Sequence, residues 1–150
     1  MTEPTQLERC GWFLQECLGA DDVGHSGRTL FAHLKGTYEL LRSWGVAEEV
    51  CVAGLFHSVY GTRVFRHRCL EPTARNRGLV AYMIGERAER LVYLFCVADR
   101  PHFAEAGAVG RELDDLCLIE KANLQEQRSN RQRSNRQRPL KEKSSSRKRS

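Results

Sequence analysis

Two histidines are the residues of this 150-residue chain whose type and spacing best suit chemistry. His33 and His57 lie twenty-four residues apart, each in a segment of helical periodicity, and the second segment ends in the apolar run AGLFH. A helix that becomes apolar on all sides usually enters the core, so His57 should be buried. Two imidazoles brought inward by neighbouring helices form either a metal site or a pair of hydrogen-bonded core histidines. Both interpretations stay open on this evidence.

The elements that must position these histidines are predicted from the spacing of apolar residues. Stripes at i, i+3, i+4 and i+7 predict helices over residues 6–18, 29–44, 47–57, 73–84, 86–99 and 111–124. Alternation of apolar and polar residues, which would indicate strands, does not occur over any useful length. The predicted fold class is therefore all-α, a bundle of about six helices over residues 5–124.

The C-terminal residues 125–150 form a separate region by composition. From Lys121 onward the chain has 11 basic and 2 acidic residues, whereas the part before it has 13 basic and 17 acidic ones. The pentapeptide RSNRQ occurs twice in succession, at 128–132 and 133–137. With almost no apolar residue to bury, this region is predicted to be a disordered basic tail. Its charge favours non-specific binding of polyanions or nucleic acid through residues 128–150, or a nuclear-import signal, and solvated disorder is the simpler alternative.

The six cysteines and the N-terminus bear on the compartment. No C-x-x-C pair occurs, so neither a zinc ribbon nor a thioredoxin-type redox site is indicated. The N-terminus lacks the pattern of a signal peptide, and the apolar runs are too short to span a membrane. The expected location is the cytoplasm, or the nucleus if the tail is an import signal.

The segment from His25 to Asp99 resembles the HD-domain superfamily of metal-dependent phosphohydrolases. Three motifs carry the resemblance, SGRTLFAH before His33, AGLFHSVYGT around His57, and VADR with Asp99. Within the superfamily the order and spacing are similar to those of the alarmone hydrolases of the RelA/SpoT type. AGLFHSVYGT also resembles an uncharacterised HD-like family of unknown function. The resemblance implies that His33, His57 and Asp99 are metal ligands, with Asp99 on a buried helix.

Two features of the HD pattern are missing, the aspartate of the His-Asp pair and the acidic pair that follows it. Ser58 stands where the aspartate of the His-Asp pair belongs, and a neutral hydroxyl is a much poorer ligand than a carboxylate. The acidic pair that the resemblance places shortly afterwards is replaced by Tyr60 and Gly61. Hydrolysis in the manner of the alarmone hydrolases is therefore not expected.

The remaining set of two imidazoles and one carboxylate is typical of open zinc or non-haem iron sites. Mn, Fe or Zn would be the expected metal, and it could generate a hydroxide nucleophile from bound water. Arg63 and Arg66, with Tyr60, follow His57 closely and could bind a phosphate or carboxylate of a small-molecule substrate. Solvated arginines and a tight turn explain the same residues equally well.

Three functions stay open from the sequence. The first is a metal-dependent hydrolase or oxygenase acting on a small phosphorylated or acidic metabolite. The second is a catalytically inactive HD-like module that binds a ligand or partner, which Ser58 favours. The third is a nucleic-acid-associated protein that binds through its basic tail.

Overall fold

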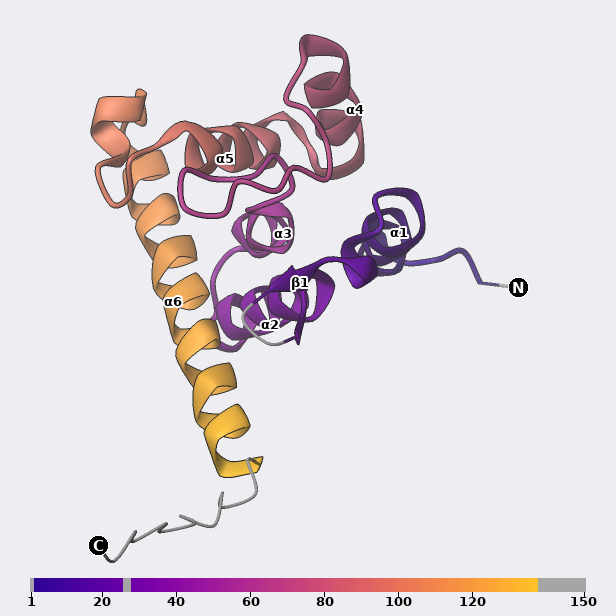
Figure 1. The fold of residues 1–150 in the computed structure, drawn as a ribbon. Helices are drawn as coiled ribbons and strands as arrows, with labels where there is room; N and C mark the ends of the chain where they lie inside the picture. Colours follow the sequence, from indigo (N-terminus) through magenta and orange to yellow (C-terminus); the bar gives the residue numbers. More distant parts are fainter. Residues whose placement is uncertain (1, 26–27, 138–150) are drawn as a thin grey trace, which may run out of the picture.

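Helices make up most of the computed structural model, which describes residues 2–25 and 28–137. The predicted all-α fold class is confirmed (Figure 1). The longer helices are α1 (Gln6–Trp12), α2 (Leu30–Ser43), α3 (Glu48–Phe56), α4 (Ala74–Ile84), α5 (Glu86–Val97) and α6 (Arg111–Gln137). A π-helical turn (Phe13–Cys17), two short 3-10 turns (Ala20–Asp22 and Phe103–Ala106) and a two-stranded antiparallel hairpin, β1 (Gly24–His25) and β2 (Arg28–Thr29), complete the described elements. No helix in the described part of the chain is long and apolar enough to cross a membrane.

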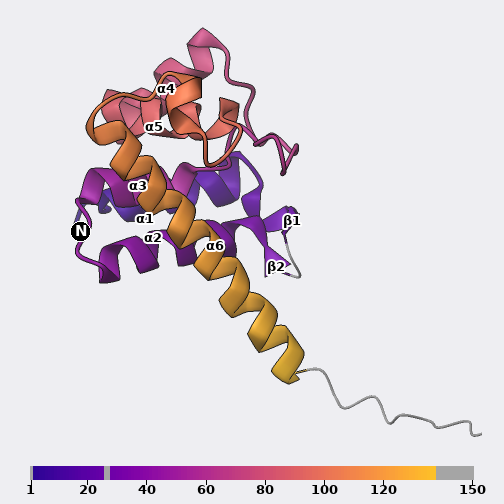
Figure 2. The same cartoon turned by 90° about the vertical axis from the view of Figure 1, so that its left-hand side faces the viewer.

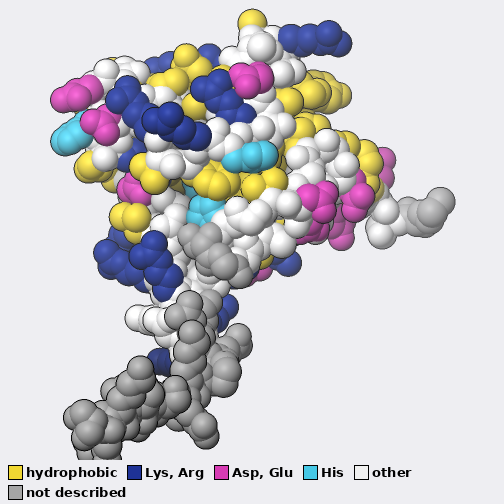
Figure 3. All heavy atoms as spheres, viewed as in Figure 1, with side chains coloured by type: hydrophobic (Ala, Val, Ile, Leu, Met, Phe, Trp, Pro, Cys, Tyr) yellow, Lys and Arg dark blue, Asp and Glu magenta, His cyan; other side chains and the backbone are white. Residues whose placement is uncertain are grey.

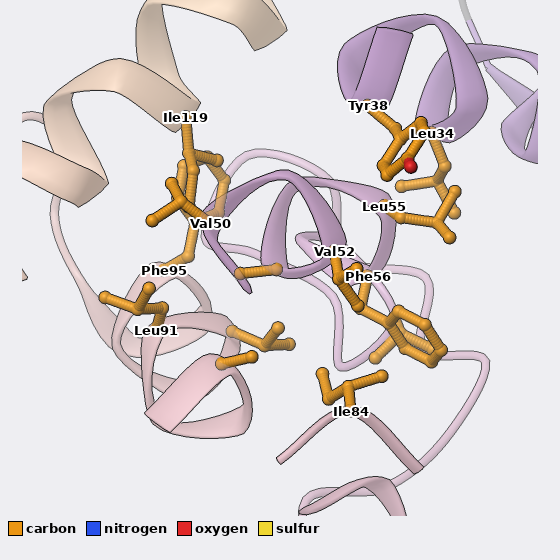
Figure 4. Packing of buried hydrophobic residues seen from close by; sticks show 14 of the residues in the cluster. Leu34, Tyr38, Val50, Val52, Leu55, Phe56, Ile84, Leu91, Phe95 and Ile119 are labelled. Atoms are coloured by element: carbon orange, nitrogen blue, oxygen red, sulfur yellow. The ribbon is translucent and has the colours of Figure 1, made fainter. Parts of the chain in front are cut away.

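Helix α3 is the centre of the core. Every residue of α3 from Val50 onward is buried, because the helix packs against α2, α5 and α6. Figure 4 shows side chains of α2, α4, α5 and α6 arranged around it. A Cβ at Gly54 would collide with the side chain of Leu41, so glycine permits the close approach of α2 and α3. The predicted burial of His57, immediately after this helix, follows directly and is observed.

Threonine caps set the start of three helices. Thr29 begins α2 by accepting a hydrogen bond at its Oγ1 from the backbone N–H of Ala32, at 3.1 Å. Thr5 and Thr73 do the same for α1 and α4. Because such a cap fixes where a helix begins, it also fixes which residues of the first turns point inward. On α2 the cap places His33 on the buried face.

Helix α6 runs past the boundary that its apolar residues predict. It continues to Gln137 rather than ending near Leu124, so the predicted disordered tail is wrong for residues 125–137 (Figure 2). Its buried positions keep a spacing of three and four residues along the whole contact with the body. One stripe of them runs through Leu116, Ile119, Asn123, Glu126 and Asn130, with the buried Asp115 and Ala122 beside it. The prediction failed because the second half of this stripe is polar. The rest of the predicted tail, 138–150, lies outside the described residues.

Candidate functional site

Three histidine rings meet beside the core. His33 of α2 and His57 after α3 are 1% and 2% exposed, and their ring centroids lie 5.2 Å apart, edge to face. His25 of β1 stacks on His33 at 4.3 Å with an interplanar angle of 11°. Phe95 of α5 closes the other side of His57, with ring centroids 5.1 Å apart. The structure thus brings together the two predicted histidines and adds a third. Ser26 and Gly27 of the SGRTLFAH motif lie outside the described residues.

Both ring nitrogens of His33 are engaged by α6. Nδ1 lies 2.9 Å from Oε1 of Glu126, and Nε2 lies 2.8 Å from Oδ1 of Asn123. The Asn123 amide donates from Nδ2 to Glu120 at 3.0 Å, which leaves its oxygen to accept from His33 Nε2–H. One proton therefore also lies between Nδ1 and the Glu126 carboxyl group, since two lone pairs cannot form that contact. Burial, followed by the neighbouring His57 and His25, lowers the pKa of His33.

Arginines close both ends of this network. Arg28 of β2 forms an ion pair with Oε1 of Glu126, which is 7% exposed at its side chain. At the other end, Nη1 of Arg100 lies 3.2 Å from Oε2 of Glu120. A continuous chain of hydrogen bonds and ion pairs thus connects the hairpin, α2, α6 and the loop after α5. Buried charges need such partners, and here α6 supplies the carboxylates.

His57 is held in one tautomer. Its Nδ1 lies 2.7 Å from the carbonyl oxygen of Gly54, which can only accept, so Nδ1 carries the hydrogen. Burial lowers the pKa of His57 to about 4, with Arg100 and His25 adding to the shift, while the Gly54 bond and Asn123 oppose it. The ring is therefore neutral near pH 7, and Nε2 offers a lone pair.

A polar cavity of about 260 Å³ adjoins His57. Its lining residues come from the hairpin, from the segment after α3, from the loop after α5 and from α6: Gly24, His25, His57, Ser58, Thr62, Val64, Phe65, Arg100, Asn123, Gln127 and Arg131. Two arginines and no aspartate or glutamate are among them. Ser58 is 2% exposed, and its Oγ has no hydrogen-bond partner among the described residues; Nδ1 of His25 likewise has none. The cavity therefore presents two arginines, together with a hydroxyl and an imidazole nitrogen that have no hydrogen-bond partner among the described residues.

Asp99 does not join the histidines. Helix α5 ends at Val97, Ala98 is extended, and Asp99 is exposed and absent from the cavity lining. The expectation that Asp99 sits on a buried helix is wrong. Pro101 follows closely, and the residue before a proline is disfavoured in the helical conformation, so the chain leaves the helix early.

The donor set does not fit the metal site that the HD resemblance implies. His33 would have to give up Asn123 or Glu126 to bind a metal, His57 offers one nitrogen, and Asp99 is exposed. Ser58 supplies only a neutral hydroxyl. In the described part of the chain, no group of three or more His, Cys, Asp or Glu side chains is placed to hold a metal ion.

The predicted substrate-binding residues are dispersed. Tyr60 is fully buried and donates its hydroxyl hydrogen to Oε1 of Glu89 at 3.2 Å, so it faces α5 rather than the cavity. Arg63 and Arg66 are exposed and line a separate surface hollow with Arg68, and Nε of Arg63 donates to the carbonyl of Val97 at 3.2 Å. The structure therefore brings none of the three to the histidines.

Sequence reasoning missed the α6 wall of the cavity. Asn123, Gln127 and Arg131 line it, and Glu126 binds His33 behind it. The signal that could have found them is the spacing of three and four residues, which polar residues continue after Ile119. A search restricted to apolar residues ends the helix too soon.

Fold and site together define an all-α protein with a buried histidine cluster beside a cationic cavity. Residues 13–100 match the family described as a domain of unknown function (DUF6817), and since the match covers more than half of the chain, the protein belongs to this family. No curated protein matches the chain. No solved structure matches it either. The matched region contains the three histidines, Ser58 and Arg100, whereas α6 lies beyond it.

Proposed function

We propose that this domain binds a small anionic molecule in the cavity beside His57. The observation that carries the proposal is the buried Ser58 Oγ, which has no hydrogen-bond partner among the described residues and lines a cavity shared with Arg100 and Arg131. Leaving a buried hydroxyl unpaired costs about 1–3 kcal/mol, so a partner from a ligand would stabilise the complex. None of the described residues that line the cavity has a carboxylate that would repel an anion.

The groups around the cavity indicate the chemistry of the ligand. Nη1 of Arg100 contacts Glu120, and its Cζ lies 4.6 Å from the centroid of the Phe95 ring. These contacts fix the guanidinium group, and its other N–H groups can donate to an anion. Ser58 can donate to an anionic oxygen. Nε2 of His57 accepts a hydrogen bond, so a ligand hydroxyl or a protonated acid oxygen matches it. A volume of about 260 Å³ is small for a ligand site, where about 300–1,000 Å³ is usual. A small carboxylic or phosphorylated acid fits these features.

The contacts of His33 favour binding of an anion over metal-dependent catalysis. A hydrolase or oxygenase of the kind that the resemblance suggests needs carboxylate and imidazole ligands around one point, and here His33 is already engaged on both sides. This is the inactive HD-like module among the functions predicted from the sequence. Elemental analysis of the native protein tests the distinction, and stoichiometric Mn, Fe or Zn that is lost in His57→Ala would contradict this proposal.

Calorimetric titration of the full chain with inorganic phosphate and with malonate, at constant ionic strength, tests the binding. We expect saturable binding of at least one of them, weakened about tenfold or more by Ser58→Ala, because a hydrogen bond to a charged group contributes about 1.5–3 kcal/mol. The fold should tolerate this change, since Oγ makes no bond to the described residues. Ser43→Ala is the control, an exposed serine whose Oγ donates to Leu40 and which lies outside this cavity. Equal affinity of native protein and Ser58→Ala would refute the assignment.

A further inference from the structure

The last turns of α6 form a separate basic surface. Arg128, Arg131, Arg133 and Arg136 are exposed, and no acidic residue follows Glu126 within the helix. Figures 1 and 2 show this end of α6 extending beyond the body of the protein. Residues 128–137 would span about 15 Å at the usual rise of an α-helix. Figure 3 shows Lys and Arg side chains beside the middle of α6 and also over the upper part of the molecule, whereas Asp and Glu side chains lie near α1 and at the upper left.

The RSNRQ repeat gives this surface a particular geometry. At about 100° per residue, the two arginines of one repeat lie about 60° apart on the helix. A shift of five residues turns the next repeat by about 140°, so the pair Arg128 and Arg131 and the pair Arg133 and Arg136 face opposite flanks. The helix therefore has positively charged side chains on two flanks. A partner that presents negatively charged groups on both sides of the helix would complement this arrangement.

The base of this helix is fixed to the body. Glu126 contacts Arg28 and His33, and Asn130 is 8% exposed on the same face. Among the described side chains of α6, Asn130 is the last buried one, so the arginines of the second repeat extend from an anchored helix and lose less conformational freedom on binding than a flexible chain would.

We propose that residues 128–137 bind duplex DNA by inserting the helix into the major groove. That groove is about 12 Å wide, admits an α-helix and has a phosphate backbone along each wall. The narrow major groove of an RNA duplex admits side chains poorly, so DNA should bind more tightly. A membrane surface is less suitable, since residues 128–137 contain no apolar residue to enter the lipid.

The experiment measures binding of the full chain to a 20-base-pair DNA duplex by fluorescence anisotropy over a series of salt concentrations. We expect affinity to fall steeply with salt, and Arg128→Gln with Arg136→Gln to reduce the slope of log K against log salt by about 1.8, at about 0.9 per phosphate contact. These two arginines do not line the cavity beside His57. An unchanged slope and affinity in this double variant would overturn the proposal.

A charge-neutral variant separates a helix in a groove from a charged tail. Gln132 is exposed between the arginine pairs, and Gln132→Pro breaks the helix there while every charge of the chain is kept. We expect Gln132→Pro to weaken duplex binding at least about tenfold, whereas Gln132→Ala leaves it unchanged. Equal binding of these two variants would show that charge alone acts and would overturn the proposal. Equal or tighter binding to an RNA duplex of the same sequence, or to phosphatidylserine vesicles, would overturn it as well.

Discussion

The hydrogen bond between His57 Nδ1 and the Gly54 carbonyl fixes what the ring offers to the cavity. With the hydrogen on Nδ1, the lone pair is on Nε2, and the ring is a neutral acceptor beside two arginines. An aspartate at position 58 would place a negative charge on the cavity and oppose an anion. Ser58 has a neutral hydroxyl instead, which under the proposed function donates a hydrogen bond to an anion.

Burial of His57 makes stability depend on pH. Its pKa is lowered from 6.5 to about 4 in the folded protein, so between these values the unfolded chain binds a proton that the folded chain does not. His57 therefore makes its whole contribution to the free energy of unfolding above pH 6.5. This contribution decreases as the pH falls towards 4, by about 3 kcal/mol for this group alone. His25, whose pKa is also lowered, acts in the same direction.

Urea unfolding of the native protein and of His57→Asn at pH 7.5, 6 and 5 measures this effect. The asparagine does not titrate and can still offer an amide hydrogen to Gly54. We expect His57→Asn to be less stable than the native protein at pH 7.5, with a difference that narrows as pH falls. A difference that stays constant across the three pH values would contradict the buried neutral ring.

Helix α6 connects the hydrophobic core to the polar network that involves α2 and the hairpin. Its first half packs Leu116 and Ile119 into the core, and its second half binds α2 and the hairpin through polar groups. Gly36 makes room for this contact, since a Cβ there would lie 2.9 Å from the side chain of Glu126. The cavity and the buried histidines depend on a helix whose packing is partly ionic.

Glu126→Ala tests this ionic packing. The change leaves Arg28 and His33 facing each other without their shared carboxylate, and breaking a buried pair costs about 3–5 kcal/mol. We expect a loss of about 3 kcal/mol in the free energy of unfolding, measured by urea denaturation. Gln125→Ala, at the exposed neighbouring position, should change it by less than about 0.5 kcal/mol. Similar small effects for both variants would mean that the network does not hold α6.

Apolar periodicity predicted the helices because the core is built from them. The stripe on α2 and the apolar end of α3 placed His33 in a helix, His57 at the end of one, and both inside the protein, as observed. Periodicity could not reveal the second half of α6, because Asn123 and Glu126 are buried for their hydrogen bonds rather than for their hydrophobicity. Periodicity also could not show that α5 ends before Asp99, because the end of this helix is determined by the backbone preferences of the residues before Pro101.

At the scale of the whole molecule, charge is divided between two ends. The part before Lys121 has more acidic than basic residues, and the part from Lys121 onward is strongly basic. Both proposed binding sites include residues of α6. Arg131 lines the cavity, whereas Arg128 and Arg136 lie outside it and belong to the proposed DNA-binding surface. Variants at Ser58 and at Gln132 therefore address the two proposals separately.

The side-chain NMR signals of the histidines report directly on whether the cavity beside His57 binds a small anion. The full chain, labelled with ¹⁵N-histidine, is titrated with phosphate or malonate at fixed pH and ionic strength. We predict that the signals of His25 and His57, which line the cavity, shift to saturation at the calorimetric Kd, whereas those of the exposed His67 and His102 do not. Unchanged signals of His25 and His57, or equal shifts at His67 and His102, would contradict the account.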